Sequence, residues 1–265
     1  MTNIFHEIQL DLGKNPFQEL SQQTHFEHIG KGRLGNQLIE MKNNKIPIIR
    51  STAKFTTPYN VFTTLHHKII DLASSKFKEK GIEHVHFNNA LIEIYEDEYR
   101  KMKYHSDHRL DLDSDSYIGL FTCYENEQEV TVDHVRKLKV KHKACQTESE
   151  ILLWPNSFVL FSTQANSQYH HKIVKDFVQP TKKTSKNKWL GITFRLSKTF
   201  IEFKNNKPYF ENGTELVKPD EESEKAFYQL RGADNRNIEF EYPEINFSIN
   251  PADFINISPI SPLRY

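Results

Sequence analysis

One stretch of the chain, residues 60–81, repeats its apolar side chains at a helical spacing. The repeating positions are Val61, Leu65, Ile69, Leu72, Ala73 and Phe77. Apolar residues that recur every three to four positions share one face of a helix, and the glycine at 81 suits the end of one. The pattern predicts an amphipathic helix over 60–81. A second helix, short and acidic, is predicted at 218–232.

The pattern changes to short apolar or alternating runs after residue 84, which is typical of strands. These runs cover residues 84–97, 116–126, 135–146, 150–163 and 188–200, and a further strand-like segment covers 46–55. Such short strands with turn signals between them predict a mainly β fold with flanking helices (α+β), in which antiparallel sheets form a sandwich or barrel. We divide the chain into an N-terminal lid and supporting helix (1–83), a β core (84–200) and a C-terminal extension (201–265), all within one compact domain.

The charged residues balance, with 35 Lys and Arg against 35 Asp and Glu. This balance excludes a protein that attracts nucleic acid or membranes through its overall charge, so a local patch must recognise any polyanionic partner. Residues 172–207 hold ten Lys or Arg against two acidic residues. In addition, Lys137, Lys139, Lys141 and Lys143 alternate along one predicted strand and share one face.

The chain carries none of the sequence signals for export or membrane insertion that we sought. It has no apolar run of 18 residues, and residues 1–17 lack the basic and apolar regions of a secretory signal. Its two cysteines, Cys123 and Cys145, cannot form a disulfide framework. We therefore expect a cytoplasmic protein with no membrane partner.

Residues 30–35, with the sequence GKGRLG, match the glycine spacing of a dinucleotide-binding turn. The context does not fit, because residues 24–29 do not form a buried strand and no acidic residue closes a second strand about 20 residues further on. We interpret this segment as a flexible loop.

The segment 104–112, with the sequence YHSDHRLDL, is the strongest candidate for chemistry. His105 and Asp107 are one residue apart, so on an extended chain both side chains reach the same side and can bind one metal ion. A His-x-Asp pair with one distal histidine forms the triad of mononuclear Fe(II) oxygenases, and His170 or His171 can supply that histidine. Arg195 follows at the end of a predicted strand, where a planar guanidinium can bind a carboxylate through two hydrogen bonds.

In these motifs the chain resembles the AlkB-like branch of the 2-oxoglutarate and Fe(II)-dependent oxygenases, from about residue 87 to residue 200. The matching pieces are NNALIEIY (88–95), HSD (105–107), FVLFS (158–162), HHKIV (170–174) and GITFRLS (191–197). The resemblance implies a double-stranded β-helix, or jelly roll, with His105, Asp107 and His171 as iron ligands. It selects His171 over its neighbour because His171-Lys172-Ile173 fits the family pattern. It further implies Fe(II), 2-oxoglutarate as co-substrate and O2, with Arg195 and Tyr95 contacting the co-substrate.

The sequence departs from the family pattern in three places. Trp189 occupies the position, six residues before Arg195, where the family usually has a second arginine, and Glu93 replaces a common asparagine. His108 and Arg109 stand where an acidic residue often follows the His-x-Asp pair and helps to recognise the base. These departures affect co-substrate and substrate binding rather than the iron ligands.

The resemblance predicts oxidative demethylation of N-methylated bases in nucleic acid, with a single-stranded or flipped-out base as the partner. Residues 46–60 carry Arg50, Lys54, Phe55 and Tyr59 and could form a substrate lid or an ordinary packed strand. One alternative is the same oxygenase chemistry on a protein side chain or small molecule. Another is a jelly-roll module without enzymatic activity that holds Zn²⁺, because the same ligands accept other divalent ions.

Overall fold

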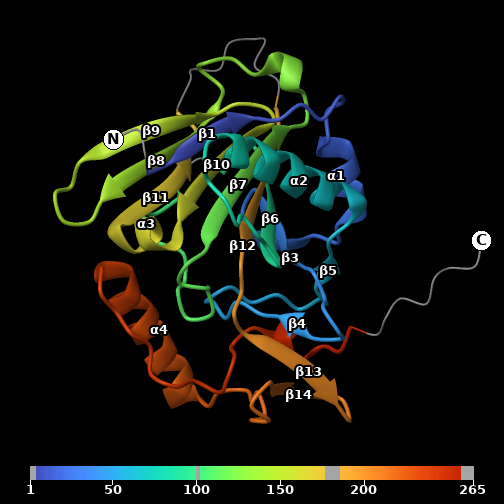
Figure 1. Ribbon diagram of the computed structural model, residues 1–265, viewed down its shortest axis with the longest axis vertical. Helices are drawn as coiled ribbons and strands as arrows, with labels where there is room; N and C mark the ends of the chain where they lie inside the picture. The colour runs from blue at the N-terminus through green and yellow to red at the C-terminus, as the bar shows by residue number, and fades with distance from the viewer. Residues whose placement is uncertain (1–3, 100–101, 177–185, 258–265) are drawn as a thin grey trace, which may run out of the picture.

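A large mixed sheet forms the centre of the computed structural model, which describes residues 4–99, 102–176 and 186–257 (Figure 1). Its strand order is β1-β10-β7-β12-β6-β3-β2, with β5 beside β3, and every pairing except β3–β5 is antiparallel. The strands are β1 (His6–Gln9), β2 (Glu27–Gly30), β3 (Arg33–Ile39), β5 (Asn60–Val61), β6 (Asn89–Tyr95), β7 (Tyr117–Tyr124), β10 (Ser157–Ser162) and β12 (Trp189–Arg195).

Two small sheets complete the β structure. One has the order β11-β8-β9 and contains β8 (Arg136–His142), β9 (Glu148–Leu153) and β11 (Tyr169–Val174); the other has the order β14-β13-β4 and contains β4 (Ile46–Pro47), β13 (Phe200–Lys204) and β14 (Lys207–Phe210). The helices are α1 (Phe17–Gln23), α2 (Thr64–Glu79), α3 (Thr163–Gln168) and α4 (Glu221–Arg236), with 3₁₀ turns η1 (Glu127–Glu129) and η2 (Pro251–Phe254).

The chain alternates between the large sheet and the sheet β11-β8-β9. It runs from β6 in the large sheet to a backbone bridge between His105 and His171 at the edge of the small one, and then back to β7. From β7 the chain passes through β8 and β9 of the small sheet, returns to β10 of the large sheet and crosses again to β11 of the small one. The last strand of this winding is β12, in the large sheet. This winding is a double-stranded β-helix, so the predicted mainly β fold with flanking helices is confirmed.

The two faces of the large sheet bury different sets of side chains. Ile92, Phe121 and Leu190 pack in one core cluster with Ile69 and Phe77 of α2. Figure 1 shows α1 and α2 on that side of the sheet. The opposite face, which includes Leu120 and Trp189, packs against Leu138, Val140 and Ile173 of the small sheet. The interior between the two sheets is therefore the place where side chains from both can form a site.

Both predicted helices are confirmed, as α2 within 60–81 and as α4 at 221–236, but the predicted strand 46–55 is wrong beyond its start. Only Ile46–Pro47 forms ladder pairs. The backbone nitrogen of Arg50 donates instead to the Asp111 side chain at 2.6 Å, so a side chain replaces a neighbouring strand as its partner.

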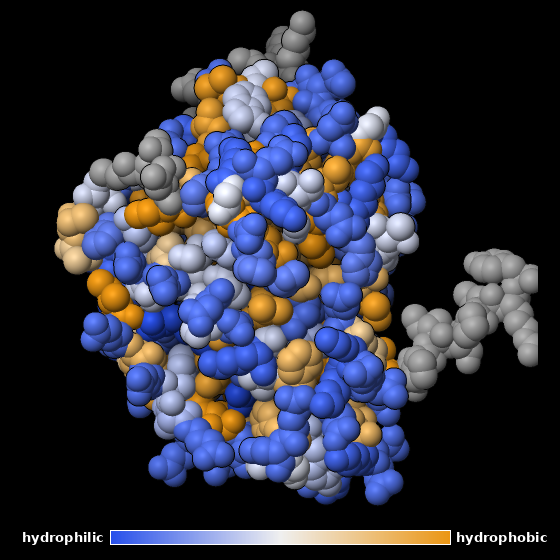
Figure 2. Space-filling model, viewed as in Figure 1, coloured by the Kyte–Doolittle hydropathy of each residue, from blue (hydrophilic) through white to orange (hydrophobic). Residues whose placement is uncertain are grey.

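The predicted three-part division of the chain stays a prediction. Strands β1, β2, β3 and β5 of the first part nevertheless belong to the same sheet as the core strands. Across the described ranges, no helix is long and apolar enough to cross a membrane. Figure 2 shows hydrophilic residues over most of the face in view, with hydrophobic ones scattered among them.

Candidate active site

His105, Asp107 and His171 converge at the edge where the chain crosses between the two sheets. His105 and His171 exchange backbone hydrogen bonds of 3.0 and 2.7 Å, so the two histidines lie directly opposite each other. The distance from Asp107 Oδ1 to Nε2 is 3.5 Å for His171 and 3.9 Å for His105. One ligating atom from each residue lies within 4.8 Å of the others, so a single ion can contact all three.

The surroundings keep His105 and Asp107 in the protonation states that a metal ion requires. Burial and the nearby His171 lower the pKa of His105 to about 3, so its imidazole is neutral at pH 7. Burial alone would raise the pKa of Asp107, but the Arg195 guanidinium and His171 hold it well below its ordinary value. A neutral imidazole at His105 and an ionised carboxylate at Asp107 are ready to bind a divalent cation without losing a proton.

Two histidines and one carboxylate are the donor set of mononuclear Fe(II) oxygenases, which leaves the other coordination positions open. The three residues therefore fit Fe(II) by their chemistry as well as by their distances. His170 does not take part, because its Nε2 contacts the backbone oxygen of Asn235 at 2.6 Å. Of the two adjacent histidines, it is His171 that faces Asp107.

The two residues predicted to contact the co-substrate lie in different surroundings. Arg195 lines the cavity in front of the triad and donates from Nε to Asp107 Oδ2 at 2.7 Å. Tyr95 is fully buried on β6, behind the cavity lining. Its hydroxyl donates to Glu93 Oε2 at 2.8 Å, and its ring lies 4.7 Å from the Trp189 ring between centroids.

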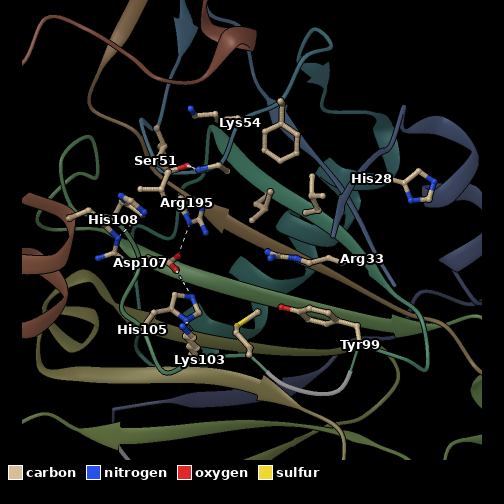
Figure 3. Close-up of a pocket in the computed structure, with 18 residues that line it drawn as sticks. His28, Arg33, Ser51, Lys54, Tyr99, Lys103, His105, Asp107, His108 and Arg195 are labelled. Atoms are coloured by element: carbon tan, nitrogen blue, oxygen red, sulfur yellow. Dashed lines mark hydrogen bonds and ion pairs between the residues drawn. The ribbon is translucent and has the colours of Figure 1, made fainter. Parts of the chain in front are cut away.

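A cavity of about 780 Å³ opens in front of the triad, and its wall is strongly cationic (Figure 3). The cationic residues of the lining are Arg33, Lys54, Lys103, Arg195 and Arg231, and the one carboxylate among the lining residues is Asp107. Residues 51–55 form one side of the cavity. Lys54 and Phe55 therefore lie where a substrate lid would place them. The cavity combines a metal-binding group with a surface suited to an anion.

Two of the four predicted lid residues serve the fold instead, which corrects that interpretation. Arg50 is buried and binds both carboxylate oxygens of Asp111 through its guanidinium. Tyr59 is also buried and donates its hydroxyl to the Asp253 side chain. Both side chains are therefore committed to partners inside the protein.

The lysine face predicted for nucleic acid lies on the outer side of the small sheet. There Lys137 pairs with Glu150 and Asp176, and Lys141 pairs with Glu148. None of these lysines is among the residues that line the cavity. Residues 177–185 of the basic run 172–207 lie outside the described residues.

The sequence interpretation missed two arginines of the cavity. Arg33 lies in the GKGRLG segment, which is a hairpin between β2 and β3 rather than a flexible loop. The run RLGNQLI of β3 does not alternate apolar and polar residues, so no local pattern marked Arg33 as a cavity residue. Arg231 belongs to the acidic helix α4, and no local pattern singles it out.

Two departures from the family pattern acquire structural explanations. Arg109 points away from the cavity, donates to Asp234 Oδ1 at 2.5 Å and binds the Ile238 carbonyl at 2.7 Å. It therefore fastens α4 to the core. Trp189 is 1% exposed and fills the end of the interior between the sheets.

No family model and no curated protein matches this chain. Among solved structures, "The structure of OsALKBH1" matches 74% of this chain and 99% of its own length, with 11% identity and a TM-score of 0.48. The structure of a Pseudomonas putida prolyl-4-hydroxylase matches 68% of this chain and 79% of its own, with 12% identity and a TM-score of 0.36. Both likenesses are weak, so the residues of the site, and not these matches, indicate what the protein does.

Proposed function

We propose that this protein is a 2-oxoglutarate and Fe(II)-dependent oxygenase that removes methyl groups from bases of single-stranded nucleic acid. The observation that carries the proposal is the convergence of His105, Asp107 and His171 on one point at the floor of a cationic cavity. Bound there, Fe(II) and 2-oxoglutarate supply the oxidising power that converts a C–H bond to C–OH with O2. An N-methyl group hydroxylated in this way leaves as formaldehyde.

The residues of the chain hold and orient the reacting groups. His105, Asp107 and His171 would hold the metal, and Arg195 fixes the Asp107 carboxylate through a hydrogen bond to its Oδ2. The double-stranded β-helix holds His105, His171 and Arg195 on paired backbone. Asp107 lies just after the His105 bridge, where its backbone nitrogen donates to Asn166 Oδ1 at 2.8 Å, so its position is also fixed. The space between the two sheets is filled at the Trp189 end by a packed apolar cluster, which leaves little room for water there.

The nucleic-acid substrate is supported by the charge and size of the cavity. Lys103 and Lys54 are exposed at the wall, and Lys54 also pairs with Glu224 at 2.6 Å. Cations at such positions can contact phosphates next to an extruded base. A volume of about 780 Å³ lies within the range of sites for small organic ligands, which includes a nucleobase.

The test is formaldehyde and succinate release from single-stranded oligonucleotides that carry different N-methylated bases. We expect release above the no-substrate rate for at least one base, and none with the Asp107→Ala variant. Binding should weaken with salt, because phosphate contacts release counterions. Succinate release that no oligonucleotide stimulates would contradict the nucleic-acid substrate.

A second candidate is the same chemistry on a protein side chain or a small molecule. Two observations favour it: Lys137 and Lys141 are paired with acidic residues, and Arg109 is turned away from the cavity. Succinate release stimulated by N-methylated or proline-containing peptides, but not by oligonucleotides, would select this candidate.

A further inference from the structure

Strand β12 provides no cation at the position six residues before Arg195. Trp189 stands there, and its indole folds over Gly191, where an added Cβ would lie 2.0 Å from the ring. The indole nitrogen donates to the Thr122 hydroxyl, so the side chain is held in place. A dicarboxylate that binds a metal at His105 and Asp107 must therefore find its second cation on another strand.

Arg33 lies in the same cross-strand row as Trp189. Trp189 pairs with Tyr95 on β6, and Tyr95 pairs in turn with Arg33 on β3. Directly paired residues project their side chains to the same face of a sheet, so Arg33 enters the interior at the depth of Trp189. Two strand spacings separate the two residues, which is roughly 10 Å. Figure 3 shows the Arg33 side chain directed into the cavity, on the side facing Asp107 and Arg195.

The Arg33 guanidinium is only partly committed to its protein partner. Its Nε donates to Glu93 Oε1 at 2.7 Å, and its Nη2 contacts the same oxygen. The third nitrogen, Nη1, is not part of this ion pair. Tyr99 lies beside the group, with Arg33 Cζ 5.5 Å from its ring centroid. Because a guanidinium can present two nitrogens of a second edge, it can bind another carboxylate while it keeps the first.

The charges of the interior also favour an anion. Arg33, Arg136 and Arg195 contribute three guanidinium groups, against the carboxylates of Glu93 and Asp107. Arg136 binds the backbone carbonyls of Glu96 and Tyr99. One positive charge is in excess before any metal binds, and a divalent ion at the triad raises the excess to three. A doubly charged anion offsets most of it in a buried space, where uncompensated charge is costly.

We infer that Arg33, with Tyr99 beside it, binds the distal carboxylate of 2-oxoglutarate, while the keto-acid end of the molecule faces the triad. This inference rests on the proposed function. Arg33 on β3 would supply the cation that β12 lacks at Trp189. The Glu93 carboxylate then holds the Arg33 side chain in place, and it competes with the distal carboxylate of the co-substrate for the same guanidinium.

The test compares two ligands that differ only in the distal group. The Mn²⁺-loaded protein is titrated calorimetrically with 2-oxoglutarate and with 2-oxopentanoate, which has a methyl group in place of the distal carboxylate. We expect Arg33→Met to weaken 2-oxoglutarate binding by about 10- to 100-fold, the usual range for a charged hydrogen-bonded contact. Binding of 2-oxopentanoate should change by less than about 2-fold, because it lacks the group in question. Lys31→Met, on the exposed turn of the same hairpin, is the matched control and should bind both ligands as the wild type does.

Glu93→Gln gives a test of opposite sign. Removing the competing charge should tighten 2-oxoglutarate binding and leave 2-oxopentanoate binding unchanged. Equal 2-oxoglutarate affinity in the wild type and Arg33→Met would overturn the inference but leave the proposed function intact. If Arg33→Met does not fold, unchanged or weaker binding by Glu93→Gln would overturn it instead. A wild-type protein that binds Mn²⁺ but neither ligand would contradict the proposed function, and the inference with it.

Discussion

Arg195 holds one oxygen of the Asp107 carboxylate and leaves the other to face His171. Its Nε donates to Oδ2 at 2.7 Å, while Oδ1 lies 3.5 Å from His171 Nε2. A carboxylate that is fixed through one oxygen presents the other oxygen in a constant direction. Hydrogen bonds of this kind orient metal ligands and so tune the affinity for the metal. Arg195 is therefore placed to orient the candidate iron ligand.

Replacement of Arg195 by Met should accordingly weaken metal binding as well as co-substrate binding. We expect the affinity for Mn²⁺ to fall by about 10- to 100-fold, the usual effect of losing a hydrogen bond to a ligand. Arg195→Lys should restore part of it, because the charge is kept and the planar geometry is lost. The measurement is calorimetric titration with Mn²⁺. Full metal affinity in Arg195→Met, with weak 2-oxoglutarate binding, would show that Arg195 serves the co-substrate alone.

The adjacent histidines give a matched pair of variants for the metal site. His171→Ala removes a group that faces Asp107, so Mn²⁺ binding should fall to the background of nonspecific sites. His170→Ala removes a side chain that faces Asn235 instead, so the Mn²⁺ affinity should stay within about 3-fold of the wild type. Circular dichroism would show that both variants fold. Comparable losses in the two variants would contradict the assignment of His171.

The triad could be predicted from the sequence because most of its geometry is local. His105 and Asp107 are two residues apart, and the distal histidine needed only a match to the pattern around Ile173. Arg33 could not be predicted in the same way. Its place in the cavity depends on two successive strand pairings, β3 with β6 and β6 with β12, which residue spacing does not determine.

The fold shows the same division between local and non-local information. The periodic pattern of α2 and the alternation in β8 depend on one buried face each, so the sequence predicted both. The apolar run 46–55 looked equally like a strand. It pairs as a ladder only at Ile46–Pro47. Ile48 still donates to the Thr199 carbonyl, but Arg50 then meets the Asp111 side chain rather than a free strand edge. Availability of a partner is a property of the whole fold.

The buried pair of Arg50 and Asp111 should be among the most sensitive sites for stability. Their side chains are 6% and 0% exposed, respectively. Asp111→Ala would leave the Arg50 charge buried without its carboxylate, and we expect a loss of about 3–5 kcal/mol in the free energy of unfolding. Urea denaturation measures the change. Glu211→Ala, which breaks the exposed pair with Lys45, is the control and should cost less than about 1 kcal/mol. Similar losses for the two variants would contradict this account.

Fastening of α4 by Arg109 should be visible in amide hydrogen exchange. Arg109 binds Asp234 of the helix and the carbonyls of Asn237 and Ile238 just after it. Arg109→Ala should therefore speed exchange in α4, and loosen Arg231 at the cavity wall, while exchange in α2 stays unchanged. Unaltered protection of α4 would show that packing of Phe227 against Ile245 and Ile249 suffices to hold the helix.

His66 should make the stability of the fold depend on pH. It is fully buried at the start of α2, where the Thr63 backbone nitrogen donates to its Nδ1 at 2.9 Å. Burial, assisted by the neighbouring His67, lowers its pKa from 6.5 to about 4. Between about pH 6.5 and pH 4, His66 is therefore protonated in the unfolded chain but stays neutral in the folded protein. Stability contributed by the neutral imidazole is complete above this range and is lost as the pH falls through it.

The variant that isolates this effect is His66→Gln, because glutamine at the same helix position can also accept the Thr63 hydrogen bond. Between pH 7 and pH 5, the wild type should lose about 2 kcal/mol more unfolding free energy than the variant does. Urea denaturation at the two pH values measures this difference, and the contributions of all other titrating groups cancel in it. His86→Gln, at an exposed position, is the control and should keep the wild-type pH dependence. If His66→Gln loses as much stability as the wild type between these pH values, the buried imidazole is not the group that responds to pH.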